Sequence, residues 1–595
     1  MWRLMTVRHR APFVPAVYSL LLALLVLGPV LTPGYLLLRD AVSTPRSYLT
    51  DSALGLTDAA ARAVPQDALL ATLSAVVDGG LLVKVILLAA LWAAGWGAAR
   101  MVAAVLPTAG LGPQLVATTV MVWNPYVAER LLQGHWSLLT GYAALPWTVC
   151  AAVAIRRGRP QGWFALAACL AAAGLTPTGV LLAAATALAV LVAPGGRSAA
   201  WRRATGALIL FVLASAPWLV ATALSGGGDG SDPAGVAAFA ARAEPGLATI
   251  GSLAGLGGIW NSAAVPDSRT TLFALFGTLA LLGLVLLGLP ALWRRRRNPV
   301  VSALAALALV AVLAPAFGAT AWGLDLGRWV VQAIPGAGLL RDAQKWVALA
   351  APLYALAAAA AVLALPRIAA ALSRRPNTAV LLQRPSTWSV SAVVVVLLSL
   401  PDLAWGVGGA LRPIEYPQSW QQVASQLDTD PNSGDVAVLP AGMFRKFPYS
   451  GPAPVLDPAP RMLPEDVLQT GELVVAGGVV QGEGSRARHV ERVLLTGGSP
   501  AELAALGVRW VLVERDTPGL RGESATTLAD LERLFSDEHL ELYRVDGDVA
   551  PHQSSGQARA AVITAHALWA LMLSGGLLGA GVLEVHARRQ RRYQS

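Results

Sequence analysis

Cysteine and charge are both scarce in this chain, and each shortage excludes a class of protein. The 595 residues include two cysteines, Cys150 and Cys169, which lie in apolar segments and exclude a disulfide framework or a thiolate metal site. Only 13% of the residues are charged, whereas about a quarter are charged in a typical soluble domain. With 55% hydrophobic residues and a mean hydropathy of +0.56, the composition indicates a membrane protein.

Several motifs of soluble enzymes and pumps are also missing. The sequence has no P-loop, no Gly-x-Ser-x-Gly elbow and no His-Glu-x-x-His pair, which argues against an ATP-driven pump, a serine hydrolase or a zinc protease. A regular ladder of buried acids, as expected for an ion-coupled transporter, is absent as well. The net charge of +10 comes from basic residues that flank apolar segments, so we expect membrane lipids as partners and no nucleic acid.

Apolar segments alternate with arginine clusters along the chain. About twelve stretches of roughly 18–24 residues are each long enough to cross a bilayer core of ~30 Å. The clusters between and after them are Arg156–Arg157–Arg159, Arg197–Arg202–Arg203, Arg294 to Arg297, Arg367–Arg374–Arg375–Arg384 and Arg588–Arg589–Arg591–Arg592. The positive-inside rule places such clusters in the cytoplasm, and even numbers of spans between them keep both termini there. We therefore predict a polytopic α-helical protein of the plasma membrane with about twelve transmembrane helices.

The predicted organisation has three parts. Residues 1–405 form a multi-span transmembrane domain, with a first span at Phe13 to Leu38 and a long first outer loop at 39–80. Residues 406–557 carry charges of both signs and three helix–strand alternations, which predict an extracytoplasmic α/β domain. The alternations are Trp420 to Leu427 before Asp435–Leu439, Ser499 to Leu506 before Arg509–Glu514, and Thr526 to Phe535 before Leu540–Val545. Residues 558–595 form the last transmembrane helix and a basic cytoplasmic tail.

Two polar clusters fall at predicted outer membrane edges, where ionisable residues are costly unless they are paired or wetted. Asp40, after Arg39 at the end of the first span, is a candidate general base for an acceptor hydroxyl. The alternative is that Arg39 snorkels to headgroups while Asp40 starts a loop. In Asn124–Trp136, Glu129 is a second candidate base or a sugar or metal ligand, Arg130 a phosphate ligand and His135 a proton partner. The alternative is an interfacial helix with aromatic anchors.

Two further segments carry candidate binding residues. Arg341 and Lys345 precede the tenth span and suit the phosphate of a lipid carrier, although simple snorkelling is the alternative. In the predicted α/β domain, Phe444, Arg445 and Tyr449 follow a strand, where binding loops are common, and are candidate surface contacts for an acceptor glycan. Trp420, at a helical position in the same domain, is expected in the core.

These features together resemble the GT-C superfamily of integral-membrane glycosyltransferases. The resemblance rests on a first span ending in an acid, a long first outer loop, many later spans, and a C-terminal extracytoplasmic α/β domain. The segments NPYVAERLLQGHW (124–136), LRDAQKW (340–346) and YPQSW (416–420) are similar to actinobacterial members that build envelope glycans, such as the N-terminal part of the α-1,3-arabinofuranosyltransferase family. GT-C enzymes place a catalytic acid in the first outer loop, often beside a second one. Asp40 matches that position, but no second acid adjoins it.

The resemblance implies transfer of a sugar from a polyprenyl-phosphate donor to a cell-envelope glycan or glycolipid at the outer membrane face. Asp40 and Glu129 would then serve catalysis, with Arg39, Arg130, His135, Arg341 and Lys345 around the donor. No cofactor beyond the lipid-linked donor is implied, although a divalent cation would be compatible with the chemistry. The alternative is a non-catalytic envelope-assembly factor or a flippase for a lipid-linked glycan.

Overall fold

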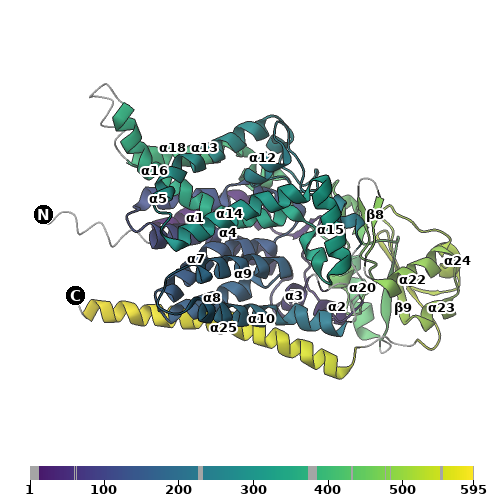
Figure 1. Ribbon diagram of the computed structural model, residues 1–595. Coiled ribbons are helices and arrows are strands. Elements are labelled where there is room, and N and C mark those ends of the chain that lie inside the picture. The colour runs from purple at the N-terminus through teal and green to yellow at the C-terminus, as the bar shows by residue number, and fades with distance from the viewer. Residues whose placement is uncertain are drawn as a thin grey trace.

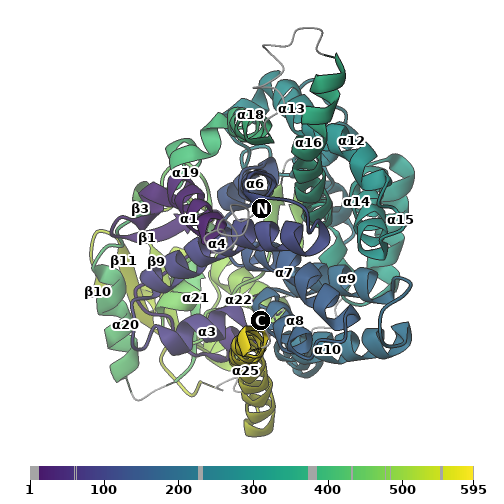
Figure 2. The same cartoon turned by 90° about the vertical axis from the view of Figure 1, so that its left-hand side faces the viewer.

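The computed structural model describes residues 13–58, 61, 63–225, 232–372, 385–430, 433–475, 478–482, 484–549 and 554–593. A helical bundle forms one end of the molecule and an α/β unit forms the other (Figure 1). Helix α1 (Val14–Leu27) begins, and α25 (Gly556–Tyr593) ends, at the bundle end away from the α/β unit (Figures 1 and 2). The predicted arginines at 374, 375 and 384 lie outside the described residues.

A helix occupies each of the predicted spans. After α1 they are α4 (Gly79–Val105), α5 (Leu111–Val122), α7 (Leu138–Arg156), α8 (Gln161–Ala173), α9 (Pro177–Val192), α10 (Ala200–Leu224), α13 (Phe273–Trp293), α14 (Pro299–Gly318), α16 (Ala351–Leu372), α18 (Pro385–Leu398) and α25. Shorter helices connect them: α2 (Asp51–Leu54), α3 (Gln66–Leu73), α6 (Pro125–Gln133), α11 (Ala234–Ala238), α12 (Thr249–Ala254), α15 (Ala321–Ala333) and α19 (Ala404–Gly409).

Fewer helices than the predicted twelve are long and apolar enough to cross a membrane. In the part of the chain that the structure describes, 8 helices pass this test, and a ninth span results if α18 and its bent continuation Pro401–Gly409 are one span. Helices α5, α8 and α9 have 12, 13 and 16 residues, or roughly 18–24 Å, less than a ~30 Å core. The chain is thus a multi-pass membrane protein, and the count of twelve is not confirmed.

The first span is shorter than the predicted segment from Phe13 to Leu38. Its helix ends with a 3-10 turn at Gly28–Leu31, and Tyr35–Leu38 forms strand β1 instead. β1 pairs antiparallel with β2 (Ala41–Val42) on one side and with β3 (Pro413–Ile414) on the other. The chain therefore leaves the bundle early because a strand from the start of the α/β unit pairs with it.

The α/β unit is built on a four-stranded sheet in the order β10-β11-β9-β4. Strand β4 (Asp435–Leu439) is parallel to β9 (Val508–Glu514), and β11 (Leu540–Arg544) is antiparallel to both β9 and β10 (Glu532–Ser536). The other elements are α20 (Ser419–Thr429), β5 (Phe444–Arg445), β6 (Val455–Leu456), α21 (Ala459–Met462), β7 (Leu473–Val475), β8 (Gly478–Val480), α22 (Ser485–Leu495), α23 (Pro500–Ala505) and α24 (Ser524–Ala529).

Two of the three predicted helix–strand alternations are confirmed, and the third is partly wrong. Helix α24 ends at Ala529, and the residues up to Phe535 that were expected to continue it form strand β10, because they pair with β11. The prediction that Trp420 belongs to the core is confirmed, since it is buried under the sheet with Val423 and Leu427. The predicted boundaries at 405/406 and 557/558 stay predictions.

The topology can be checked by labelling in whole cells, after Cys150 and Cys169 are replaced by serine. The exposed positions Ser433 and Ser555, changed to cysteine, should react with a membrane-impermeant maleimide in intact cells. Cysteine at the exposed Arg295 should react only after lysis, because positively charged loops stay in the cytoplasm. Labelling of Arg295→Cys, but not Ser433→Cys, in intact cells would invert the predicted orientation.

Candidate active site

Asp40 lies at the tip of the β1–β2 hairpin, in a two-residue turn with Arg39. Arg39 is held at φ +49°, a conformation that costs a non-glycine residue about 1–3 kcal/mol. Its guanidinium offsets this cost by donating hydrogen bonds to the carbonyl of Leu132, at 2.6 Å, and to that of Ala263. Arg39 therefore anchors the turn and fixes the direction in which Asp40 points.

His135 follows the end of helix α6 and lies against this hairpin, and the residues that cap the two ends of the helix fix this position. The side chain of Asn124 accepts a hydrogen bond from the Val127 amide at 3.2 Å, and Pro125 occupies the first turn, as in many helix starts. The helix ends at Gly134, at φ +86°, where a Cβ would lie 2.2 Å from the Ala41 nitrogen. Only glycine permits this approach, which places the next residue, His135, against Asp40.

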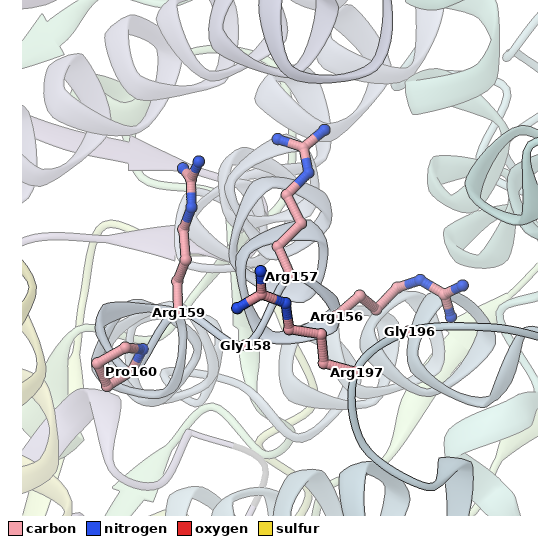
Figure 3. A pocket seen from close by; sticks show the side chains of 7 residues that line it. All are labelled: Arg156, Arg157, Gly158, Arg159, Pro160, Gly196 and Arg197. Carbon is pink, nitrogen blue, oxygen red and sulfur yellow. The ribbon is translucent and has the colours of Figure 1, made fainter.

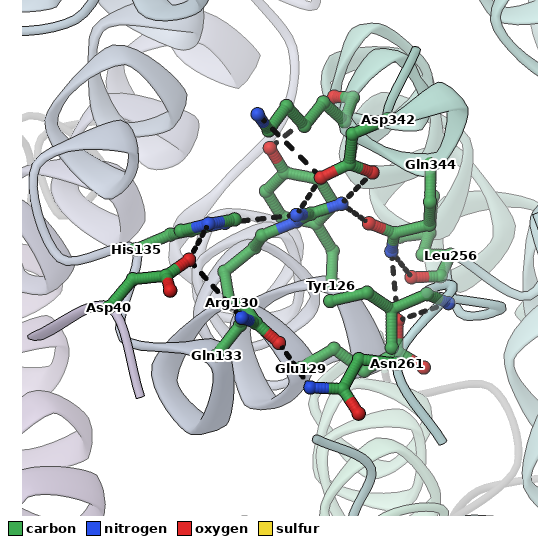
Figure 4. Close-up of polar contacts among 12 residues, drawn as sticks. Asp40, Tyr126, Glu129, Arg130, Gln133, His135, Leu256, Asn261, Asp342 and Gln344 are labelled. Carbon is green, nitrogen blue, oxygen red and sulfur yellow. Dashed lines mark hydrogen bonds and ion pairs between the residues drawn. The ribbon is translucent and has the colours of Figure 1, made fainter. Parts of the chain in front are cut away.

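The Asp40 carboxylate is held on one side only (Figure 4). Its Oδ2 atom accepts hydrogen bonds from His135 Nε2 at 2.9 Å and from Gln133 Nε2 at 3.1 Å. Its Oδ1 atom has no hydrogen-bond partner among the described residues, and the side chain is 29% exposed. One oxygen is thus fixed by the protein, and the other has no partner among the described residues.

The arrangement determines the protonation states of this pair. Burial disfavours the charged form of Asp40, but the hydrogen bonds from His135 and Gln133 outweigh it, so the pKa of Asp40 lies below its ordinary value. Burial lowers the pKa of His135, which keeps the imidazole neutral. Because a neutral imidazole has one donor, the hydrogen bond to Asp40 uses Nε2–H, and Nδ1 accepts from Arg130 at 3.0 Å.

Arg130 lies behind His135, with its side chain 0% exposed. Its guanidinium binds the Asp342 carboxylate in a forked manner, at 2.7 Å and 3.1 Å. It also donates a hydrogen bond to Oε1 of the Gln344 side chain. Lys345 Nζ lies 3.6 Å from the same Asp342 carboxylate and is 23% exposed. All of these contacts come together in one network (Figure 4). The prediction that Arg130 binds the phosphate is therefore wrong, because a buried and paired guanidinium cannot reach a substrate.

Glu129 is also a supporting residue, which corrects its assignment as a second catalytic base. It is buried and accepts hydrogen bonds from the Gly258 and Ile259 amides, each at 3.1 Å, and from Gln344 Nε2 at 3.0 Å. Burial and the charge of Glu244 raise its pKa to about 8. Because these donors occupy both oxygens, Glu129 fixes the loop that follows Leu256 and does not face an acceptor.

Arg341 and Lys345 have different surroundings. Lys345 belongs to the network, whereas the Arg341 guanidinium lies over the Phe239 ring at 5.6 Å and donates to the Asp232 carbonyl at 3.5 Å. That Arg341 lies around the donor together with Asp40 stays a prediction. Asp342, the next residue, was not among the predicted site residues, and it is the one that pairs with Arg130 and Lys345.

The candidate acceptor residues of the α/β unit also differ from one another. Arg445 is buried and paired with Asp457 and Glu514, so the expectation that it is a surface group is wrong. Phe444 and Tyr449 are half-buried, and the Tyr449 hydroxyl accepts a hydrogen bond from Trp420 at 3.2 Å. Only part of this segment is therefore available to a ligand.

Four residues of the site were missed at the sequence level: Gln133, Asn261, Asp342 and Gln344. Asn261 donates to Gln133 at 2.8 Å, and Gln133 in turn holds Asp40. Gln133 stood inside the polar segment 124–136, and Asp342 beside Arg341, so proximity to those residues was the available signal. Asn261 had no such signal, since it reaches the site only through the fold.

A divalent cation has no evident set of ligands in the described residues. No group of three or more His, Cys, Asp or Glu side chains is placed there to hold a metal ion. The two carboxylates nearest the site, Asp40 and Asp342, are bonded to N–H donors instead.

Comparison with known proteins finds matches among solved structures. No protein-family model and no curated protein matches the sequence. Solved structures do match, and they show that the chain has the fold of part of an arabinofuranosyltransferase. The matching structures include the arabinofuranosyltransferase AftD from Mycobacteria, at 18% identity and a TM-score of 0.58 over 90% of this chain. Two structures of a mutant of that enzyme match with TM-scores of 0.55 and 0.53, at 17% and 16% identity.

The likeness is confined to one part of the larger enzyme. The match covers 40% of the AftD chain in the first structure and 42% in each of the other two. At this level of identity it shows the fold, and the resemblance predicted from the sequence is confirmed to that extent.

Loss of His135 should change the pH dependence of any activity that uses Asp40 as a base. In His135→Ala the pKa of Asp40 should rise, because the carboxylate loses its principal hydrogen bond, so the acid limb of the pH–rate profile should move to higher pH. Gln133→Leu should move it in the same direction by a smaller amount. A lower rate with an unmoved acid limb would contradict this role of His135.

Loss of Arg445 should destabilise the α/β unit without a specific effect on substrate use. Arg445→Met leaves Asp457 and Glu514 buried without their cation, and breaking such a pair typically costs about 3–5 kcal/mol. Thermal unfolding of the purified protein measures this loss, with the exposed Arg533→Met as the control. An unchanged melting temperature together with poorer acceptor use would restore Arg445 as a binding residue.

Proposed function

We propose that this chain is a membrane glycosyltransferase that moves a sugar from a polyprenyl-phosphate donor to a cell-envelope glycan or glycolipid. The observation that carries the proposal is the half-held carboxylate of Asp40. Its pKa is depressed, one oxygen is fixed by two donors, and the other is unpartnered at the membrane edge. An ionised carboxylate in this setting suits the removal of a proton from an acceptor hydroxyl.

The other residues of the network have distinct roles in this proposal. Lys345, partly exposed and beside Asp342, supplies positive charge where the phosphate of the donor develops negative charge as it leaves. His135 orients Asp40 and keeps it ionised. Arg130 and Glu129 position these groups from within the protein and do not touch substrate.

The placement of Asp40 suits a lipid-linked donor. The residue follows α1 by one short strand, so a donor with its chain in the bilayer would reach it from the side. The matching solved structures reported above are of an arabinofuranosyltransferase, AftD. A polyprenyl-phospho-arabinofuranose is therefore the first donor to test.

The β5–β6 hairpin of the α/β unit is the proposed acceptor surface, because it joins the Asp40 turn directly. The Leu456 amide donates to the Arg39 carbonyl at 2.8 Å, and Phe444 is the strand partner of Leu456. Phe444 is half-buried and Lys446 is exposed, so an aromatic ring and a cation lie one strand from the turn. Aromatic rings stack on sugar faces, and a cation favours an acidic glycan.

A non-catalytic envelope-assembly factor or a flippase remains the second candidate. It is favoured by the absence of an acid next to Asp40 in the sequence. Such a protein would need the lipid-linked glycan to bind but would not need the Asp40 carboxylate.

The substitution Asp40→Asn separates the two functions. It keeps the shape and removes the base, so sugar transfer in proteoliposomes should fall by about 10²–10⁴-fold, with binding of the donor lipid unchanged. Asp325→Asn is the control, because this carboxylate is 76% exposed and paired only with Arg328. Full activity in Asp40→Asn would show that Asp40 is not the base. Donor-lipid binding without sugar transfer in the unchanged protein would make the non-catalytic function the better account.

The acceptor surface can be tested separately. The double change Phe444→Ala and Lys446→Ala should raise the KM for acceptor by roughly 3- to 30-fold, because stacking and charge are both lost. The KM for donor should not change. Leu520→Ala, an exposed apolar side chain on the same unit, is the control. An equal rise in both KM values would mean that the β5–β6 hairpin shapes the donor site instead.

A further inference from the structure

A cavity of about 500 Å³ lies at the junction of the α7–α8 turn and the α9–α10 loop. Its lining consists of Arg156, Arg157, Gly158, Arg159, Pro160, Gly196 and Arg197 (Figure 3). Helix α7 begins beside the candidate active site and has 19 residues, or about 28 Å. The cavity is therefore at the opposite end of the bundle and separate from that site.

Two buried arginines, Arg156 in the lining and Arg203 behind it, fix the loop that borders the cavity. Arg156 donates to the carbonyls of Val190, Ala193 and Pro194, and in Figure 3 it extends away from the other three arginines. Arg203 donates to the carbonyls of Leu191 and Gly195, at 2.9 Å and 2.8 Å. Both cations thus satisfy the carbonyls at and after the C-terminal end of α9, as basic residues commonly do, and they fix the loop.

The other three arginines face the opening. Arg157 donates one hydrogen bond, to the Ala104 carbonyl at 3.2 Å, and the side chains of Arg159 and Arg197 make none within the described residues. Gly158, at φ +70°, lets Arg197 lie across it, since a Cβ there would be 2.8 Å from Arg197 Cδ. The three exposed guanidinium groups therefore border the same opening.

None of these three cations forms an ion pair with a carboxylate among the described residues. The sequence has no Asp or Glu in residues 79–128, 130–228 and 268–324, which include every residue that lines the cavity. Like charges gathered without an acid repel one another, and an anion from outside the protein would remove that repulsion. Guanidinium groups bind phosphate oxygens in forked geometry, so phosphate is the anion that they suit best.

A second, smaller cavity distinguishes a lipid from a free phosphate. It measures about 220 Å³, shares Arg156, Arg157 and Gly196 with the first, and is otherwise lined mainly by apolar residues such as Val105, Val153 and Val300. The two cavities join a cationic lining to an apolar one at the end of a membrane bundle. We propose that they form a binding site for an anionic phospholipid, with its phosphate on Arg157, Arg159 and Arg197 and its glycerol and first acyl carbons in the apolar part.

Native mass spectrometry of the intact protein with defined lipids tests this site. Phosphatidylglycerol should be retained in preference to phosphatidylcholine, and the triple change Arg157→Gln, Arg159→Gln and Arg197→Gln should weaken its binding by roughly 30- to 100-fold. The control is a triple change of equal charge, Arg294→Gln, Arg295→Gln and Arg297→Gln, among exposed arginines that do not line the cavities. Inorganic phosphate and glycerol phosphate serve as soluble competitors.

Each outcome decides the proposal. Selective loss in the cavity variant, with no displacement by millimolar phosphate, supports it. Undiminished retention in that variant, or an equal loss in the control, overturns it, because surface charge alone would then explain the binding. Displacement by inorganic phosphate would assign the site to free anions and overturn the lipid. If the triple variant does not fold, the double change Arg159→Gln and Arg197→Gln gives the same decision, since neither side chain has a partner in the described chain to lose.

Discussion

The buried guanidinium of Arg130 is the constraint on which the candidate active site depends. A charge with no exposed surface costs several kcal/mol unless it is fully paired, so its partners cannot move independently. Those partners are Asp342, Gln344 and His135, which come from two segments about two hundred positions apart in the sequence. Their pairing joins α6 to the start of the span that contains α16 and so fixes the part of the bundle beneath the α/β unit.

The same pairing determines the chemistry at the surface. Because Arg130 donates to Nδ1 of His135, the imidazole must present Nε2–H to Asp40, and a protonated imidazole would lose the contact with Arg130. The strained turn at Arg39 and the close approach at Gly134 bring the carboxylate within reach of that donor. A chain of fixed hydrogen bonds from the interior thus ends on one oxygen of a partly exposed acid. If Asp40 is the base of the proposed function, this preorganisation avoids reorganisation during the reaction.

Sequence reasoning located most of the helices and the right polar segments, because apolar runs, arginine clusters and helix caps are local signals. Asp40, His135 and Lys345, which it singled out, lie in one polar network, whereas Glu129 and Arg130 are buried and paired within the protein. The sequence cannot distinguish a glutamate that accepts hydrogen bonds from backbone amides from one that accepts a proton from a substrate. Only the fold shows that the Gly258 and Ile259 amides donate to the two oxygens of Glu129. Arg445 was misjudged for the same reason. The first span was drawn too long because the apolar residues of β1 continue its hydrophobic run, and the strand that stops it lies far away in the sequence.

The two ends of the bundle use arginine in opposite ways, and the distribution of acids explains the difference. Near the α/β unit, carboxylates are present, and the buried cations Arg130 and Arg269 each bind one. At the other end the sequence offers none in residues 79–128 and 130–228, and the buried cations Arg156 and Arg203 are satisfied by backbone carbonyls. Carbonyls satisfy hydrogen-bond donors but carry no net charge, and they leave the positive potential of the cluster in place. That end of the bundle therefore remains complementary to an anion supplied by its surroundings, and in a membrane the most abundant candidate is the phosphate of a lipid.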